Sequence, residues 1–215
     1  LYPCYCSRAR LQAIGAPHAG ERSVYDGHCY GMTAAERAAM QKDPSWRVHV
    51  PAAAVSFCDG VYGRQEAYLP RACGDFVVRR ADGLYAYQLA VSVDDGMMGI
   101  THVLRGRDLL SSTAQQIWLI QYLGYPAPQY THVPMLIDGE GRRLSKRQQG
   151  ITIESLRDGG ADRDSVLSYL AYKGGLVSER ARYPLEELAR RCDLTALRQE
   201  DIVVDDDVMQ AICAV

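Results

Sequence analysis

The spacing of apolar and polar positions divides this chain into a strand-rich part and a helical part. Residues 46–80 alternate apolar and polar side chains or carry short apolar runs between glycines and prolines, which predicts short strands and turns. Residues 108–123 are apolar over a wide helical stripe, which predicts a helix that packs against a sheet. Beyond Gly150 the period is helical. This mixture of strands and helices predicts an α/β fold.

Two apolar segments predict central strands. Gly99–Leu104 is apolar except for Thr101 and His102, as expected of a buried strand of the parallel type that ends at Arg105-Gly106. Tyr130–Asp138 predicts a second apolar strand, which leads into a basic loop. Ligands of open α/β sheets bind beyond the carboxyl ends of the strands, so Arg105 is placed to grip a carboxylate. The alternative for Arg105 is a salt bridge to a nearby acid.

Capping and termination signals place the helices. Thr33-Ala34-Ala35-Glu36 is a capping box, which predicts a helix to about Lys42. Apolar residues fill most of the segment 84–95, where we expect a short helix or bend around Tyr87–Val91. The other helical predictions are a short helix within 7–15, Ile151–Arg157, a helix capped by Asp162 or Asp164 and stopped at Lys173-Gly174-Gly175, one that starts at Tyr183-Pro184, and a last turn within Leu194–Asp201.

Composition narrows the class of protein. The chain has 215 residues, of which 47% are hydrophobic and 23% charged, as in ordinary globular proteins. The net charge of −2 gives no global attraction to nucleic acid, so any RNA contact would be local. No apolar run approaches the roughly 18 residues of a membrane span. Seven cysteines at irregular spacing, with no basic-then-apolar leader, predict a reducing cytoplasmic location without membrane association.

Glycines bracket a basic loop at Gly139–Gly150. A loop hinged at both ends and rich in cations can close over a triphosphate, because glycine is conformationally permissive and lysine is a movable point charge. The alternative is a solvated basic turn. Its cations are Arg142, Arg143, Lys146 and Arg147, with Ser145 between them.

The cysteines near the start have the spacing of a metal site. Cys4 and Cys6 are two apart, and Cys29 follows a turn. Thiolates that converge from two short segments form tetrahedral structural zinc sites. The alternative is free buried cysteines, which pack as small hydrophobes. The fourth ligand stays open between Tyr25 and His28, with His18 a weaker candidate.

The order of these segments resembles the second half of the catalytic domain of class I glutamyl-type aminoacyl-tRNA synthetases. Gly99–Leu110 and Tyr130–Asp138 precede Arg143-Leu144-Ser145-Lys146-Arg147, which resembles the KMSKS signature of that class. Cys-x-Cys followed by Tyr-x-x-x-Cys resembles the zinc module of glutamyl-queuosine tRNA(Asp) synthetases and of some glutamyl-tRNA synthetases. The resemblance implies a structural Zn²⁺ held by Cys4, Cys6, Tyr25 and Cys29.

The resemblance also implies roles for individual residues. Arg143, Leu144, Ser145, Lys146 and Arg147 would form the loop that binds ATP, which enters with Mg²⁺, and Lys146 would stabilise charge on the leaving pyrophosphate. Tyr87 and Arg105 would bind glutamate. Without the resemblance Tyr87 is equally well a core aromatic residue. His132 could touch nucleotide, but a strand histidine is more often a satisfied core residue, so it is not included in the site.

The fold implied is α/β, the second half of a Rossmann-like catalytic domain with an inserted zinc module and a carboxyl-terminal helical segment. The expected divisions are a zinc-containing insertion at 1–74, the catalytic half with the KMSKS-like loop at 75–150, and a helical stem-contact segment at 151–215. The family's HIGH-type signature is not found in this sequence. We therefore expect a fragment that forms adenylate poorly and exposes apolar sheet surface.

The implied function is ATP-dependent activation of glutamate and transfer of the glutamyl group to queuosine in tRNA(Asp). The lack of a large anticodon-binding domain after the helical segment favours this reading. The alternatives are a truncated ordinary glutamyl-tRNA synthetase and a non-catalytic, zinc-stabilised RNA-binding remnant. We expect a monomer, although no residue pattern decides the oligomeric state or the acceptor tRNA.

Overall fold

The computed structural model describes residues 1–13, 24–144, 152–204 and 212. They divide into two compact units. Unit 1 holds residues 1–58, 64–103 and 110–129, and unit 2 holds 59–63, 104–109 and the described residues from 130 onward.

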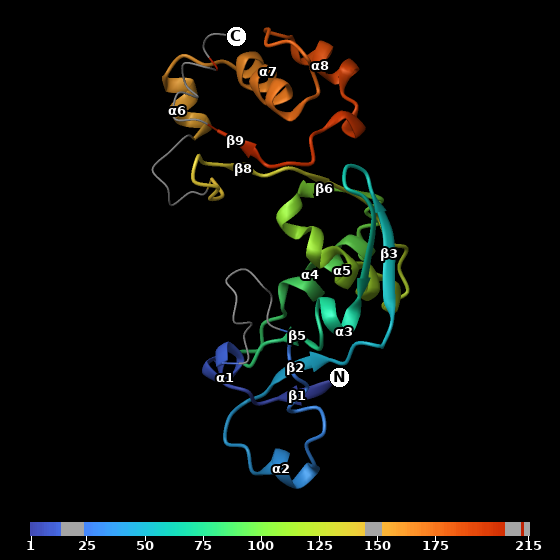
Figure 1. Ribbon diagram of the computed structural model, residues 1–215. Coiled ribbons are helices and arrows are strands. Elements are labelled where there is room, and N and C mark those ends of the chain that lie inside the picture. Colours follow the sequence, from blue (N-terminus) through green and yellow to red (C-terminus); the bar gives the residue numbers. More distant parts are fainter. Residues whose placement is uncertain (14–23, 145–151, 205–211, 213–215) are drawn as a thin grey trace. The chain divides into compact units, whose positions relative to one another are not determined.

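Unit 1 contains a small antiparallel sheet and several helices (Figure 1). The sheet has the order β1-β2-β5, with Tyr2 opposite Arg47 and Trp46 opposite Arg79. The register shifts between Trp46 and Arg47, so a bulge interrupts β2. The elements of this unit are β1 (Tyr2–Cys4), α1 (Arg8–Ala13), α2 (Ala34–Ala38), β2 (Ser45–Val48), α3 (Leu69–Ala72), β5 (Phe76–Arg79), α4 (Tyr87–Met97) and α5 (Leu110–Tyr122).

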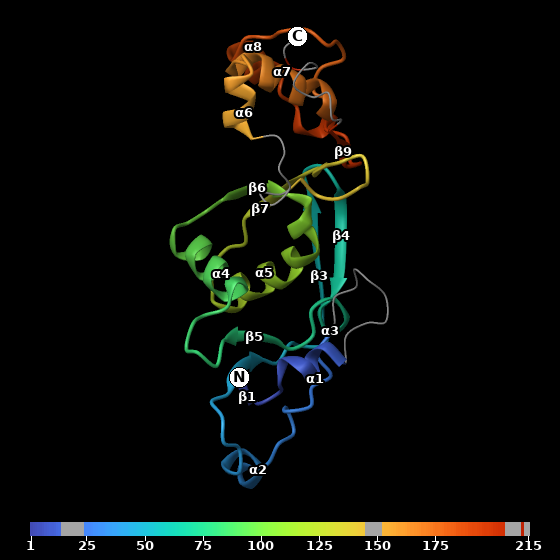
Figure 2. The same ribbon diagram turned by 90° about the vertical axis from the view of Figure 1, so that its left-hand side faces the viewer.

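The core of unit 1 lies where this sheet meets α3 and α5. Leu69 is 0% exposed and Leu119 is 3% exposed. Helices α4 and α5 pack side by side (Figure 2). Gly96 permits the approach of Tyr125 to α4, because a Cβ at position 96 would lie 2.5 Å from Cδ2 of that ring. The buried cluster comprises Val48, Val50, Leu69, Phe76, Val78 and Leu119.

A four-stranded sheet has the order β4-β3-β7-β6. Strands β3 and β7 are parallel where Asp59 faces Tyr130. Gly60 follows directly, and its N–H donates to the Tyr130 carbonyl at 3.0 Å. This pairing places the end of β3 against the start of β7. The strands are β3 (Ala54–Asp59), β4 (Gly63–Tyr68), β6 (His102–Gly106) and β7 (Gln129–Val133).

Unit 2 has helices that begin and end where the sequence signals predict. Asp162 rather than Asp164 caps α7, since its side chain accepts from the Ser165 N–H in a capping box. Gly175 ends the helix with φ of 86°, a conformation that favours glycine. The elements are the 3-10 helix η1 (Arg107–Leu109), β8 (Leu136–Ile137), α6 (Ile153–Asp158), α7 (Arg163–Gly174), α8 (Leu185–Arg191), the 3-10 helix η2 (Leu194–Ala196) and β9 (Ile202–Val203).

Several boundaries differ from the prediction. The Thr33 capping box is confirmed, but its helix ends at Ala38 instead of near Lys42. The helix expected around Tyr87–Val91 continues to Met97. The prediction that Gly99–Leu104 is a buried strand is wrong, because β6 spans His102–Gly106 and Leu104 is 60% exposed. An apolar run alone does not report burial at the edge of a sheet, where one face meets solvent.

Candidate functional site

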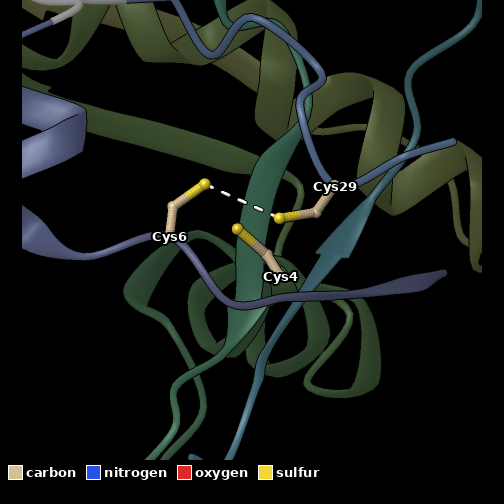
Figure 3. Close-up of side chains that lie close together, drawn as sticks. All are labelled: Cys4, Cys6 and Cys29. Carbon is tan, nitrogen blue, oxygen red and sulfur yellow. Dashed lines mark hydrogen bonds between the residues drawn. The ribbon is translucent and has the colours of Figure 1, made fainter. Parts of the chain in front are cut away.

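Three cysteine sulfurs converge in unit 1 (Figure 3). Cys4 ends β1, Cys6 follows it two residues later, and Cys29 comes from the turn after Tyr25. The sulfurs lie within 4.8 Å of one another, and Sγ of Cys6 is 3.6 Å from Sγ of Cys29. Cys4 and Cys29 are each 2% exposed. The sequence therefore brings its three predicted cysteine ligands to one point.

The hydroxyl of Tyr25 joins this cluster. Its Oη lies 3.5 Å from Sγ of Cys4 and 3.5 Å from Sγ of Cys6. The Cys29 N–H donates to the same oxygen at 2.9 Å. His28, the alternative fourth ligand, is exposed, and its N–H donates to Asp26. His18 lies outside the described residues. The geometry thus brings Tyr25, and not His28, to the sulfurs.

The groups of this cluster have unequal acidities. Burial opposes ionisation of Cys4, but hydrogen bonds with Tyr25, the backbone and Arg47 lower the pKa of this thiol to about 7. Burial raises the pKa of Cys6 to about 11. Burial, with the hydrogen bonds to the cysteines, raises the pKa of the Tyr25 phenol. One thiol thus ionises readily, whereas the other two groups need a positive charge beside them before they lose their protons.

The donor set fits a metal ion of the zinc type. Among the described residues, Cys4, Cys6 and Cys29 are the group of cysteine, histidine and acidic side chains whose ligand atoms converge. Three soft thiolates and a phenolate oxygen suit a closed four-coordinate site with no position left for substrate. Such a site would hold the segment around β1 and the turn at Cys29 together.

A charged network supports the cluster from β2. Arg47 is 6% exposed, and its guanidinium carbon lies 3.8 Å from the centroid of the Tyr25 ring. Its Nη1 donates to the Asp75 carbonyl at 2.7 Å. Burial opposes ionisation of Asp75, but hydrogen bonds from His49, the Val50 N–H and Tyr2 hold the pKa of this carboxyl below its usual range. The sequence prediction missed both Arg47 and Asp75, because nothing in a β-strand pattern marks a charged residue as buried.

A second buried network lies in unit 2. Arg105 on β6 donates from Nε to Nε2 of His132 at 3.0 Å. Nδ1 of His132 is 2.6 Å from Oδ2 of Asp59. The guanidinium carbon of Arg105 also lies 5.0 Å from the centroid of the Tyr130 ring. The predicted carboxylate-binding residue is therefore held by a histidine and an aromatic ring from β7.

His132 and Asp59 are functional candidates that the sequence prediction did not include. His132 is a satisfied core residue, as the pattern favours, but its partner is the predicted substrate residue. Burial lowers the pKa of His132 below its usual range, against the raising effect of Asp59. The one signal for Asp59 was an acid directly before a glycine at the end of an apolar run.

Tyr87 is the first residue of α4 in unit 1, and the residue is 57% exposed. Its exposure disfavours the alternative of a core aromatic residue. Arg105 belongs to unit 2. Tyr87 thus lies exposed at the start of a helix, and its role in binding glutamate stays a prediction.

The basic loop begins as a hairpin. The Asp138 N–H donates to the Arg142 carbonyl at 2.9 Å, and the Leu144 N–H donates to the Leu136 carbonyl at 3.0 Å. Arg143, at the start of the KMSKS-like run, pairs with Asp108 at 2.6 Å. Ser145, Lys146 and Arg147 lie outside the described residues.

The family model for the class I tRNA synthetase catalytic domain of the E and Q type matches residues 1–211. The chain belongs to this family. The resemblance drawn from the KMSKS-like run and the segments before it is confirmed, and this synthetase chain has the mixed α/β architecture with helices that was expected.

Three curated relatives that share one name match much of this chain. The chain is 44% identical over 218 residues to a glutamyl-Q tRNA(Asp) synthetase of Symbiobacterium thermophilum, which covers 99% of this chain and 67% of that protein. It is 43% identical over 184 residues to the enzyme of that name from Nitratidesulfovibrio vulgaris, covering 83% of this chain and 57% of the relative. A Neisseria meningitidis relative of the same name is 48% identical over 148 residues, 68% of this chain and 49% of the relative. The chain thus spans about half to two-thirds of the length of these proteins.

Solved structures support the fold. A glutamate tRNA ligase of Elizabethkingia meningosepticum superposes with a TM-score of 0.74 at 20% identity, covering 98% of this chain and 48% of that one. The glutamate-tRNA synthetase of Elizabethkingia anophelis gives a TM-score of 0.75 at the same identity.

Within the described part of the chain, none of the helices has the length and apolar character needed to cross a membrane.

Proposed function

We propose that this synthetase activates glutamate with ATP and transfers the glutamyl group to queuosine in tRNA(Asp). The observation that carries the proposal is the similarity, at 43–48% identity, to relatives named glutamyl-Q tRNA(Asp) synthetase. The exposed phenol of Tyr87 and the held guanidinium of Arg105 suit an amino acid with two carboxylates. The enzyme would act in the cytoplasm as a monomer.

In the activation step, the glutamate α-carboxylate attacks the α-phosphate of ATP and pyrophosphate leaves. Arg105 neutralises one carboxylate through its planar fork, and Tyr87 orients the amino acid. Lys146, with Arg143 and Arg147 beside it, stabilises the charge that develops on the pyrophosphate, with Mg²⁺ carried in by ATP. This is electrostatic positioning and involves no covalent intermediate with the protein.

The structural metal of this proposal is Zn²⁺, held by Cys4, Cys6, Tyr25 and Cys29. It would pin the insertion that approaches the tRNA and would take no part in the chemistry. The three-part division at 1–74, 75–150 and 151–215 remains a prediction that accompanies this assignment.

The deciding experiment is glutamate-dependent ATP–pyrophosphate exchange by the full-length protein, without and with tRNA. Exchange in the absence of tRNA is expected. Labelled glutamate should then appear on tRNA(Asp) that carries queuosine and not on the same tRNA with guanosine at that position. Exchange that requires tRNA, or label on both tRNAs, would contradict the proposal. Replacing Lys146 with Ala should slow exchange with little change in glutamate affinity.

A second candidate is an ordinary glutamyl-tRNA synthetase. It is favoured by the superposition of 98% of this chain on two glutamate-tRNA synthetases. Label from glutamate would then appear at the acceptor end of tRNA(Glu), so the same assay with tRNA(Glu) separates the two activities. Binding of tRNA with neither exchange nor labelling would leave a non-catalytic RNA-binding role.

A further inference from the structure

A continuous chain of hydrogen bonds runs from Asp59 through His132 to Arg105. His132 is 0% exposed and Asp59 is 2% exposed, so water does not compete for either contact. The distances are 2.6 Å from Asp59 Oδ2 to His132 Nδ1 and 3.0 Å from His132 Nε2 to Arg105 Nε. The reaction as derived above uses Arg105 and gives the other two residues no task.

The chemistry of arginine fixes the proton on His132. A guanidinium has only donors, so Nε2 of His132 must accept the Arg105 Nε–H. The proton of a neutral imidazole is then on Nδ1, where it donates to the Asp59 carboxylate. Protonation of Nε2 would set two donors against each other 3.0 Å apart. The geometry therefore requires one tautomer of a neutral ring.

The backbone holds Asp59 in place. Oδ1 accepts the N–H groups of Val61 at 3.0 Å and Tyr62 at 2.9 Å, and the His132 N–H is 3.2 Å from Oδ2. Burial opposes ionisation, but these hydrogen bonds lower the pKa of the carboxyl. Asp59 thus stays an anion whose second oxygen faces the imidazole.

We propose that His132 positions Arg105 for its substrate carboxylate and that Asp59 sets the tautomer that makes this possible. The inference deepens the proposed function, since it takes Arg105 as the glutamate-binding residue. The imidazole that accepts from Nε of Arg105 is neutral, so this contact orients the guanidinium without neutralising its positive charge. The charge stays available for the substrate carboxylate. The Tyr130 ring supports the same guanidinium.

Two conservative variants separate positioning from packing. In Asp59→Asn the amide oxygen, in the place of Oδ1, can keep the Val61 and Tyr62 N–H groups. It can also keep the His132 N–H, which lies 3.3 Å from Oδ1. The amide nitrogen then donates to Nδ1 of His132. That moves the imidazole proton to Nε2, against Arg105. In His132→Gln the amide oxygen takes the place of Nε2 and accepts from Arg105. The first variant should release Arg105, and the second should retain it.

Nuclear magnetic resonance of the full chain reads these states directly. In the wild type the ¹⁵N shifts of His132 should show a protonated Nδ1, and the Arg105 Nε–H should exchange much more slowly than that of Arg64, whose side chain is 81% exposed. Asp59→Asn should abolish this protection and His132→Gln should keep it. Asp75→Asn is the matched control, because Asp75 also pairs with a histidine Nδ1 but in unit 1.

Ligand affinity supplies the second readout. The probe is 5′-O-(glutamylsulfamoyl)adenosine, measured by calorimetry on the same variants. Asp59→Asn should weaken its binding by about tenfold or more, and His132→Gln by much less. A protonated Nε2 in the wild type, or Arg105 exchange and affinity unchanged in Asp59→Asn, would overturn the inference. If the wild type does not bind the probe, the glutamate site fails, and the resonance data alone decide the role of His132.

Discussion

At the scale of single residues, the two charged networks share one physical design. Each has a buried aspartate that accepts from at least one backbone N–H group and from a histidine Nδ1, and each lies beside an arginine. In unit 1 the arginine is Arg47, next to the cysteines, and in unit 2 it is Arg105. Buried charges are tolerated because their hydrogen bonds are made within the protein. Both networks therefore orient residues at the cost of a buried charge.

Burial of His132 makes stability depend on pH. The folded-state pKa of His132 lies below its ordinary value of 6.5, so below about pH 6.5 the unfolded chain binds a proton that the folded chain does not. Above this pH, His132 should not reduce the free energy of unfolding. As the pH is lowered further, the free energy of unfolding should fall by at most about 1.4 kcal/mol per pH unit. The decline should end below the folded-state pKa. Urea denaturation at pH 7.5 and 5.5 measures the effect.

His132→Gln is the control for this prediction, because glutamine does not titrate. The difference in unfolding free energy between the two pH values should be smaller in the variant than in the wild type. Equal differences in both proteins would show that His132 does not contribute.

Arg47 should determine how tightly zinc is held, if the cysteine cluster is the proposed metal site. Three thiolates and a phenolate carry more negative charge than Zn²⁺ neutralises, and the Arg47 guanidinium lies against the Tyr25 ring. Arg47→Met should lower zinc affinity by about 10- to 100-fold, as is typical when a supporting residue is removed. Competition with a chromophoric chelator measures this, with the exposed Arg64→Met as control. Equal affinity in both variants would argue against the role.

At the scale of elements, the contact between β3 and β7 depends on a missing side chain. A Cβ at Gly60 would lie 2.4 Å from Oγ1 and 3.1 Å from Cγ2 of Thr131. The absence of that Cβ lets the end of β3 approach β7 closely, and this approach brings Asp59 to His132. Small residues at such crossings are structural requirements even when their backbone angles are ordinary.

Gly60→Ala should therefore destabilise the fold by about 1–3 kcal/mol through overpacking. In a Thr131→Ala background the same change should cost less, because Oγ1 and Cγ2 are gone and the remaining Cβ is 3.2 Å away. A double-mutant cycle by urea denaturation should give a coupling energy of about 1 kcal/mol or more. Additive effects would contradict the close contact.

The sequence predicted the ends of helices more accurately than it predicted which distant residues contact the site residues. Caps at Thr33 and Asp162 and the stop at Gly175 are local signals, and the structure confirms them. Strand β9 was missed, because two residues that pair with β8 across a long loop have no local pattern. Arg105 was singled out from its strand and from family resemblance. Asp59, which lies 73 residues from its partner His132, could be recognised only after β3 and β7 were paired.

At the scale of the whole molecule, hydrophobic burial is divided among separate clusters. Among the residues that the structure describes, the cluster around the cysteines has Tyr2, Cys4 and Cys29 as its buried members, with Cys6, Tyr25 and Met32 partly buried against it. So small a core stabilises little by itself, and small modules of this kind commonly depend on a metal. The cysteine cluster is thus the part of unit 1 in which a bound ion would change stability most.

Removal of zinc should lower the thermal stability of this part of unit 1. A metal that binds the folded state alone adds RT ln(1 + [Zn²⁺]/Kd) to the free energy of unfolding. A chelator should therefore lower the unfolding temperature, and added zinc should restore it. The thiols and the phenol must lose their protons to bind zinc, and burial raises the pKa of Cys6 to about 11, so zinc affinity should also fall as the pH is lowered. Calorimetry with and without chelator, at two pH values, tests both effects. Cys29→Ser should remove the response, whereas Cys192→Ser, at an exposed cysteine, should keep it. A chelator that leaves the wild-type transition unchanged would mean that the cluster holds free thiols and that Tyr25 is simply their hydrogen-bond partner.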